Sequence, residues 1–492
     1  MVRLVLASTL ILSGCQFSFN NQNAAASPTA LQGKSTPKPG AMSSTAPAAS
    51  PSAAPSKITV SPDSLKGVQI NFWHPWTGDI GKQAAALVDE FNQSNLWGIK
   101  VNIVEQGSAG GLADALDSSL AAVRSTPMVP TASGSSSVPG NPLPDLVAAP
   151  IDELAGWQAS NQAIVNLDGY IQDGQWGLSA ADLADFPTVY WNADRLGDQQ
   201  LGIPAERSAQ VLFYNQTWAQ SLGFNSAPVT PDDFKAQACA AAQANMKDTP
   251  WQNNGTGGWV LDTSALTLIS WMQSFGGTLP QVENQPYQFD SSQVTDSITY
   301  LRQMYDKGCA WAGKEDLPYD YFSSRQALFF SGPLQDILPL TDTLAQQKST
   351  DQWVILPFPS ITRKPVLVVD GPSYAVLKSS PERQLAAWLF IHWMIQADHL
   401  ASMVQASGSL PVRVSEIDAL SAFKQRYPQW ALAQQWIPVA QPAPRLSTWR
   451  QVKPILEDAG SQTFRTNFTA DQIPQILLML DQTIQEVLQK NP

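Results

Sequence analysis

The sequence predicts an α/β protein that is divided into two lobes. In its first half, an alternating strand at 68–73 is followed by a turn, an amphipathic helix that begins at Asp79 and a second strand at 99–104. This strand–helix–strand order predicts neighbouring parallel strands. The middle of the chain is helical, and apolar strands return at 366–369 and 374–377. A chain of 492 residues is long enough for about three domain-sized units, so it has room for two α/β lobes.

Each predicted element has a local signal. The strand at 68–73 alternates in polarity, and the helix after Asp79 repeats apolar residues at a spacing of three and four. Thr230, with Pro231 after it and Asp233 three positions on, is typical of a helix start. The other predicted elements are a short strand at 145–149 and helices at 112–123, 230–246, 264–275, 291–307, 380–395 and 471–488.

Composition limits the possible functions. The net charge is −12 at pH 7, and residues 1–57 contain no acid, so the negative charge belongs to the part that we expect to fold. Such a surface repels phosphate backbones, and we expect no nucleic acid partner. The chain has only three Cys and three His, with no C-x-x-C pair. We therefore expect neither a metal site nor a cofactor.

The N-terminus has the features of a targeting segment. Residues 1–14 combine a basic start with a short apolar run, which is typical of a signal peptide. The ending Leu12-Ser-Gly-Cys15 resembles the lipobox of bacterial lipoproteins, which implies that Cys15 becomes the first mature residue and carries the lipid. An ordinary cleaved signal is the alternative. Residues 15–57 are rich in Ala, Ser and Pro and are expected to form a disordered tether.

A second segment of biased composition lies within the first α/β region. Residues 125–144 are rich in Ser, Pro and Gly and are interpreted as a surface insertion, because the α/β pattern resumes directly after them. A linker between domains is the alternative. No later segment has eighteen consecutive apolar residues, so we expect the membrane to be reached only through the N-terminal lipid.

The sequence lacks the common catalytic motifs. The chain has no G-x-S-x-G nucleophile elbow, no P-loop and no G-x-G-x-x-G. His392 and His399 lie on an apolar helix and are interpreted as packing or surface residues. A secreted glycoside hydrolase stays open as an alternative, because folding can bring two distant carboxylates together.

Two cysteines remain besides Cys15. Outside the cytoplasm an even pair usually closes a disulfide, so we expect a bond between Cys239 and Cys309. Two unpaired buried thiols are the alternative.

Seven short patterns follow one another along the chain, at 72–78, 87–92, 202–208, 212–215, 327–333, 370–373 and 407–411. Their shared order gives a resemblance, from about residue 68 to the C-terminus, to the extracellular solute-binding proteins of bacterial ABC importers, which take up sugars and glycerol phosphates. It implies a periplasmic-binding-protein-like fold, in which two α/β lobes are joined by hinge crossings and the ligand lies in the cleft between them. By this likeness 66–222 and 362–398 form lobe one, and 223–361 and 399–492 form lobe two.

The resemblance also implies ligand-binding positions, because this family lines its cleft with loops at strand ends. Trp76 is expected to stack on a sugar, since it lies in a turn after the first strand. Arg445 falls where glycerol-phosphate binders keep a phosphate-contacting arginine. The full predicted set is Trp76, Thr77, Glu206, Arg207, Ser208, Trp259, Ser331, Gly371, Ser373, Ser409, Arg445 and Trp449.

The function implied by the resemblance is capture, without catalysis, of a mono- or oligosaccharide for an ABC permease. The protein is expected to be a monomer, held at the outer face of the cell membrane by its lipid. Binding of glycerol 3-phosphate or a glycerophosphodiester is the first alternative. A secreted glycoside hydrolase and a cell-surface adhesion module are the others.

Overall fold

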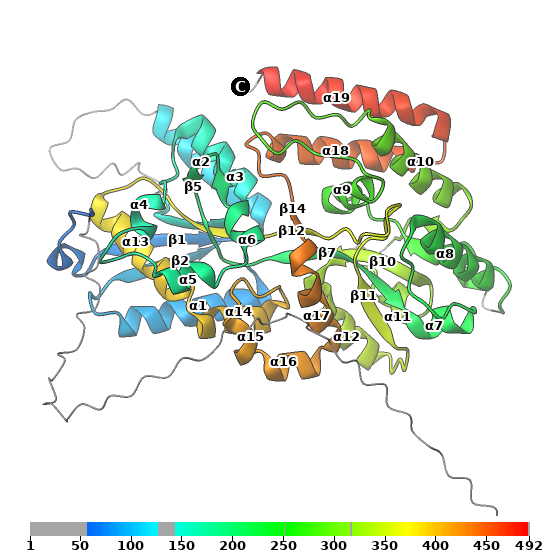
Figure 1. The fold of residues 1–492 in the computed structure, drawn as a ribbon, viewed down its shortest axis with the longest axis horizontal. Helices are drawn as coiled ribbons and strands as arrows, with labels where there is room; N and C mark the ends of the chain where they lie inside the picture. The colour runs from blue at the N-terminus through cyan, green and yellow to red at the C-terminus, as the bar shows by residue number, and fades with distance from the viewer. Residues whose placement is uncertain (1–56, 126–142, 250, 315–316, 491–492) are drawn as a thin grey trace, which may run out of the picture. The chain divides into compact units, whose positions relative to one another are not determined.

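The structure is a computed structural model, and it describes residues 57–125, 143–249, 251–314 and 317–490 (Figure 1). The signal peptide, Cys15, nearly all of the tether and most of the 125–144 insertion lie outside the described residues. The α/β class that the sequence predicts is confirmed, with two main sheets that each carry their own helices.

The first sheet has the strand order β2-β1-β3-β13-β6. Its strands are β1 (Gln69–His74), β2 (Lys100–Glu105), β3 (Leu146–Ala149), β6 (Ile203–Pro204) and β13 (Ser373–Val376). β1 is parallel to β2 and β3, as the strand–helix–strand order predicts, whereas β13 runs antiparallel to β3.

Helices cover both faces of this sheet. Phe72 points to the face packed by α1 (Gly78–Ser94) and α13 (Pro381–Met394), and its ring centroid lies 5.7 Å from that of Phe390. Trp73, the next residue, belongs to the opposite core with α2 (Ala109–Ser125) and α3 (Ile151–Asn161). Because successive side chains of a strand point to opposite faces of the sheet, the first lobe has a hydrophobic core on each face.

The second sheet has the strand order β14-β12-β7-β10-β8-β9, and β11 also pairs with β7. Its strands are β7 (Ser208–Asn215), β8 (Gly257–Val260), β9 (Ala310–Trp311), β10 (Ala327–Pro333), β11 (Trp353–Leu356), β12 (Val368–Asp370) and β14 (Gln441–Pro442). β8 is parallel to β9 and β10, so the carboxyl ends of these three strands lie at one edge. A separate hairpin pairs β4 (Arg195–Leu196) with β5 (Gln199–Gln200).

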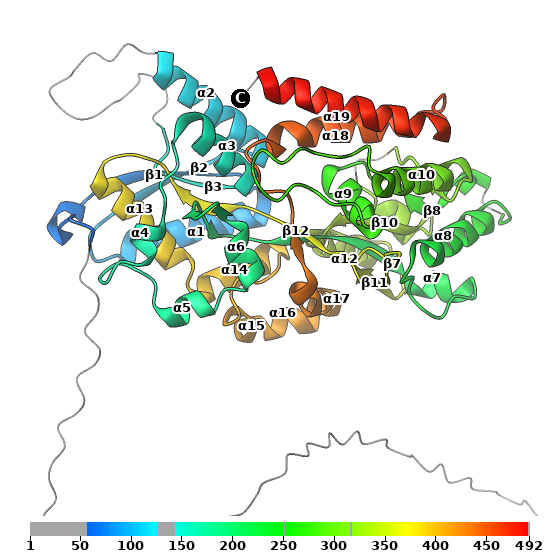
Figure 2. The same ribbon diagram turned by 45° about the horizontal axis from the view of Figure 1, so that its top comes forward.

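The second sheet is also packed on two faces. Phe329 stacks on Tyr214 and contacts Phe234 of α8 (Pro231–Asn245) on one side. Phe330 stacks on Phe213 and faces α11 (Tyr319–Ser323) and α12 (Ile337–Gln346) on the other. The first of these cores also takes in α9 (Ala265–Ser274), α10 (Ser292–Asp306), α18 (Trp449–Thr463) and α19 (Ile473–Lys490). α18 and α19 lie side by side (Figure 2).

Shorter helices complete the described part. They are α4 (Asp168–Ile171), α5 (Ala180–Ala184), α6 (Thr188–Ala193), α7 (Gln216–Ser221), α14 (Ala397–Ser407), α15 (Glu416–Ala419), α16 (Ser421–Arg426) and α17 (Pro428–Ala433), with 3-10 turns at Pro62–Leu65, Trp251–Asn253, Leu334–Asp336, Gln434–Val439 and Ala470–Gln472. None of the helices in the described ranges is long and apolar enough to cross a membrane.

The chain passes between the two sheets in places that differ from the sequence-based boundaries. β7 was expected in lobe one, but its hydrogen bonds place it in the second sheet, so the first crossing lies between β6 and β7. The second crossing joins β12 to β13. α14 was expected mostly in lobe two, yet it packs on α1, where Gln83 donates a 3.0 Å hydrogen bond to Ser402.

The disulfide between Cys239 and Cys309 is confirmed, with Cα atoms 4.3 Å apart. Cys239 lies on α8 and Cys309 directly after α10, so the bond joins two elements of the second lobe.

Candidate ligand-binding site

A cavity of about 670 Å³ opens where the parallel strands of the second sheet end. Its wall includes the residues that follow β8, the loop after β9 and the end of β10, together with Asp370 from the crossing to the first sheet. In open α/β sheets, ligands bind beyond the carboxyl ends of the strands. The polar and charged residues of the wall are Gln210, Asp262, Thr263, Ser264, Ser331, Asp336, Asp370, Lys453 and Glu457.

Asp262 is held rigidly at the end of β8. One of its carboxylate oxygens accepts a 2.8 Å hydrogen bond from the backbone N–H of Ser264, and the other accepts bonds from Thr267 and Gln210. Glu457 reaches the same place from α18 and accepts a 2.9 Å bond from the backbone N–H of Ala265. Both carboxylates therefore satisfy donors at the start of α9, where the helix dipole also favours negative charge.

Two other carboxylates, those of Asp336 and Asp370, have acceptor positions left for hydrogen bonds from a ligand. Asp336 accepts a 2.9 Å bond from the Tyr319 hydroxyl, while burial, reinforced by nearby Asp262, raises its pKa to about 7. Asp370 accepts no side-chain hydrogen bond from the described residues. Lys453 is the one cation in the wall, and Asp152 and Asp370 raise its pKa against the opposing effect of burial. Acidic side chains therefore outnumber basic ones in the cavity wall.

Of the twelve predicted ligand-binding residues, the structure places Ser331 in the cavity wall. Trp259 is fully buried behind it and donates a 3.0 Å hydrogen bond from its indole N–H to the Ser331 hydroxyl. Trp449 is also buried and stacks on Tyr287 in the core of the second lobe. Both tryptophans are packing residues here and offer no open face.

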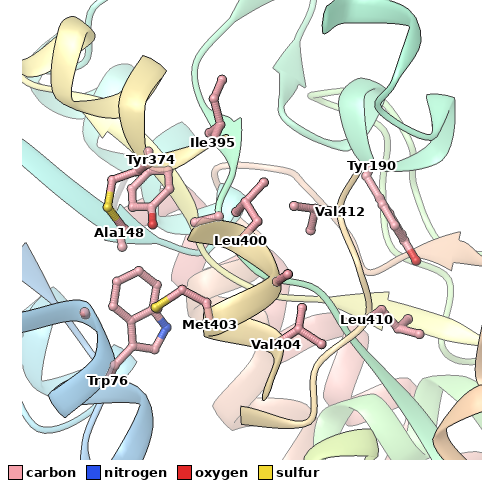
Figure 3. Packing of buried hydrophobic residues seen from close by; sticks show 14 of the residues in the cluster. Trp76, Ala148, Tyr190, Tyr374, Ile395, Leu400, Met403, Val404, Leu410 and Val412 are labelled. Atoms are coloured by element: carbon pink, nitrogen blue, oxygen red, sulfur yellow. The ribbon is translucent and has the colours of Figure 1, made fainter. Parts of the chain in front are cut away.

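Trp76 differs most from the sequence-based expectation. It is only 5% exposed, and the ring of His74 stacks over it at 5.4 Å between centroids. Its indole N–H donates a 2.7 Å hydrogen bond to Glu206, and Figure 3 shows Trp76 next to Tyr374 and Met403. The face expected to stack on a sugar is therefore covered in this conformation.

Glu206 and Ser208 form hydrogen bonds with other side chains and do not line the cavity. The Glu206 carboxylate also accepts a 3.1 Å hydrogen bond from Gln335, which in turn contacts the hydroxyl of Ser208. Burial raises the pKa of Glu206, although donors such as Gln335 and Trp76 oppose this. These side chains tie the first crossing to the 3-10 turn after β10.

Arg207 joins the two crossings. Its guanidinium is 3% exposed and forms a 2.6 Å ion pair with Asp194. It also donates to the Ser373 hydroxyl and to the backbone carbonyls of Glu206, Gly371 and Pro372. Gly371 has φ of +151°, and an added Cβ would lie 2.4 Å from the Glu206 carbonyl oxygen. Arg207, Gly371 and Ser373 are therefore built into the hinge.

The other predicted positions lie away from the cavity wall. Thr77 is exposed at the start of α1, and its side chain makes no capping bond. Ser409 is buried and accepts a 2.8 Å hydrogen bond from the Ser407 hydroxyl. Arg445 donates to the backbone carbonyl of Asn192, which belongs to α6 of the first lobe. Among the described residues, no group of three or more His, Cys, Asp or Glu side chains is placed to hold a metal ion.

The family model for bacterial extracellular solute-binding proteins matches residues 86–431, well over half of the chain. The chain belongs to this family. Membership places this solute-binding protein outside the cytoplasm. A binding protein of Brucella abortus (strain 2308) is 20% identical to it over 300 residues, which are 60% of this chain and 68% of that protein.

Solved structures share the two-lobed fold of this solute-binding protein. The sugar-binding protein MalE from Xanthomonas citri is 17% identical, with a TM-score of 0.69, and the match covers 86% of this chain and 98% of MalE. UgpB from Mycobacterium tuberculosis, in complex with glycerophosphocholine, is 16% identical with a TM-score of 0.69, over 86% of this chain and 99% of UgpB. The cyclic α-maltosyl-1,6-maltose binding protein from Arthrobacter globiformis is 16% identical with a TM-score of 0.66. The match covers 85% of this chain and 99% of that protein.

Sequence reasoning missed most of the cavity wall of this solute-binding protein. Asp262 carried a usable signal, because it follows the buried strand β8 and precedes the Thr-Ser start of a helix. Asp370 lies in the 370–373 pattern that supports the family resemblance, but it is not among the predicted ligand-binding residues. Lys453 and Glu457, one turn apart on α18, had no such signal, since only the packing of α18 brings them to the strand ends.

Proposed function

We propose that this protein is the ligand-binding component of an ABC importer, and that it captures a neutral mono- or oligosaccharide in the cavity at the strand ends and delivers it to a membrane permease. Membership of the solute-binding family supports the role in import, and the sugar-binding proteins among its structural neighbours support the ligand class. The observation that carries the proposal is the carboxylate-rich cavity.

The wall suits a polyhydroxyl ligand. Carboxylates accept hydrogen bonds from sugar hydroxyls, and a carboxyl with a pKa near 7, such as that of Asp336, can also donate one. Phe330, Val260 and Leu261 add apolar surface for the C–H faces of a sugar ring. A volume of about 670 Å³ falls within the range of small-molecule sites and leaves room for more than one sugar ring.

Binding of a glycerophosphodiester is the second candidate, because UgpB, a structural neighbour, is described with glycerophosphocholine. The charges of the cavity disfavour a phosphate monoester, since four carboxylates face a single lysine. Arg445, the residue expected to contact phosphate, bonds a backbone carbonyl of the first lobe. We therefore place glycerol 3-phosphate below carbohydrate.

Isothermal titration against neutral oligosaccharides, glycerol 3-phosphate and glycerophosphocholine tests the proposal. We expect a neutral saccharide to bind with a dissociation constant of about 10 μM or lower and the phosphate monoester to show no heat of binding. Binding of phosphorylated compounds alone would replace the ligand class. Steady hydrolysis of a glycoside in a parallel assay would replace the binding function with an enzymatic one.

We also propose that Cys15 carries a lipid that holds the protein at the outer face of the membrane. The Leu12-Ser-Gly-Cys15 sequence and the Ala/Ser/Pro-rich residues after it support the anchor. In detergent partitioning, the wild-type protein should enter the detergent phase and the Cys15→Ser protein should not. Equal partitioning of the two would refute the anchor.

A further inference from the structure

Three ion pairs connect α18 of the second lobe with α2 and α3 of the first. Arg450 pairs with Asp117 and, at 3.2 Å, with Glu153, while Lys453 lies 3.6 Å from Asp152. α18 is anchored in the core of the second lobe and α3 in a core of the first. These pairs therefore cross between the lobes.

The two surfaces are shaped to fit each other. Arg450 lies against α3 at a glycine, where a Cβ added to Gly156 would come within 2.7 Å of the Arg450 side chain. Asp117 is held in place from its own side, since Trp157 donates a 2.8 Å hydrogen bond to it. A side chain larger than glycine at position 156 would therefore push the Arg450 side chain out of its present position.

The contact is also poised to release. Its three carboxylates outnumber its two cations, and the Oδ2 atom of buried Asp152 makes no hydrogen bond to the described residues. Burial, followed by the charge of Asp152, raises the pKa of Glu153 to about 7. Desolvation of this kind offsets much of the attraction within buried ion pairs, so such a contact is reversible.

The contact borders the ligand cavity. Lys453 lines the cavity of about 670 Å³, whereas Arg450, Asp117 and Gly156 line a second cavity of about 900 Å³. Lys453 thus belongs both to the contact between the lobes and to the wall that a ligand would touch.

We propose that Arg450 and Lys453 form an electrostatic latch that holds the two lobes closed in the absence of ligand, and that Lys453 links this latch to the cavity. The latch proposal depends on the proposed function in one respect: it assumes that a ligand reaches its site when the lobes separate. Its release exposes the cavity and frees the Lys453 ammonium from Asp152 for a ligand. Arg450 is a positioning residue in this scheme, whereas Lys453 also lies where it can contact the ligand.

Electron–electron distance measurement on the ligand-free protein tests the latch without knowledge of the ligand. Nitroxides are placed at Lys82→Cys on α1 and Asp232→Cys on α8, both exposed, in a chain that carries Cys15→Ser. Cys239 and Cys309 are disulfide-bonded and take no label. The test variant combines Arg450→Met with Lys453→Met. The control combines Lys66→Met with Lys490→Met, which removes two exposed lysines from local surface pairs.

We expect one short inter-lobe distance to dominate in the wild-type and control proteins. In the latch variant the ratio of closed to open molecules should fall by about fivefold or more, because removal of both cations leaves the carboxylates of Asp152 and Glu153 buried without a counter-charge in the closed state. Thermal melting checks that the variant folds, and Gly156→Leu, which displaces Arg450 without changing charge, should open the lobes in the same way. Identical distributions in the latch variant and wild type would overturn the proposal. A failed search for a carbohydrate ligand would leave this result unaffected.

Discussion

Replacement of Arg207 by methionine is expected to lower the free energy of unfolding by about 3–5 kcal/mol, the usual cost of breaking a buried ion pair from one side. The change leaves Asp194 buried without its cation and removes the donors that bond the carbonyls of Gly371 and Pro372. Urea unfolding measures the loss. Arg426→Met, at an exposed position on α16, is the matched control and should change stability little.

The same variant separates a hinge role from a ligand-binding role. If Arg207 serves the hinge, Arg207→Lys should restore little stability, because one ammonium cannot replace a guanidinium that bonds Asp194, Ser373 and three carbonyls at once. If Arg207→Met lowers the free energy of unfolding by less than about 1 kcal/mol and also abolishes ligand binding, Arg207 is a ligand-binding residue and not a hinge residue.

Filling the cavity should abolish binding while leaving the fold intact. Thr263 is half-buried and lines the cavity just after β8, so Thr263→Trp places an indole where the ligand is proposed to lie. We expect affinity for the saccharide found by titration to fall about 100-fold or more, since ligand and side chain cannot share the space. Thr295→Trp on α10, also half-buried but outside the cavity wall, is the control. Unchanged affinity in Thr263→Trp would move the site elsewhere.

Much of the fold is readable from the sequence because its signals are local. The alternation at 68–73 and the cap at Thr230 depend on neighbours within a few residues, and the structure has β1 and α8 within one or two residues of the predicted bounds. The lobe boundaries were less accurate. β7 reads as a buried strand in either lobe, and its partners β10, β11 and β12 come from much later in the chain.

The site was harder to predict. Residues next to a hinge and residues in a cavity both occur at strand ends, in sequence patterns of the same kind. Glu206 and Ser373 lie at strand ends, as a ligand-binding residue would, yet folding turns them toward Trp76 and Arg207. Lys453 and Glu457 reach the cavity only through the packing of α18, which no local pattern encodes.

The most direct test of the carbohydrate-binding account is a crystal structure of the protein with the saccharide found by titration. The account predicts a sugar in the cavity at the ends of β8 and β10, with hydroxyls within hydrogen-bonding distance of Asp336, Asp370 and Lys453, and with Arg207 still paired with Asp194. A sugar stacked on an uncovered Trp76, with the cavity beyond β8 and β10 empty, would contradict it.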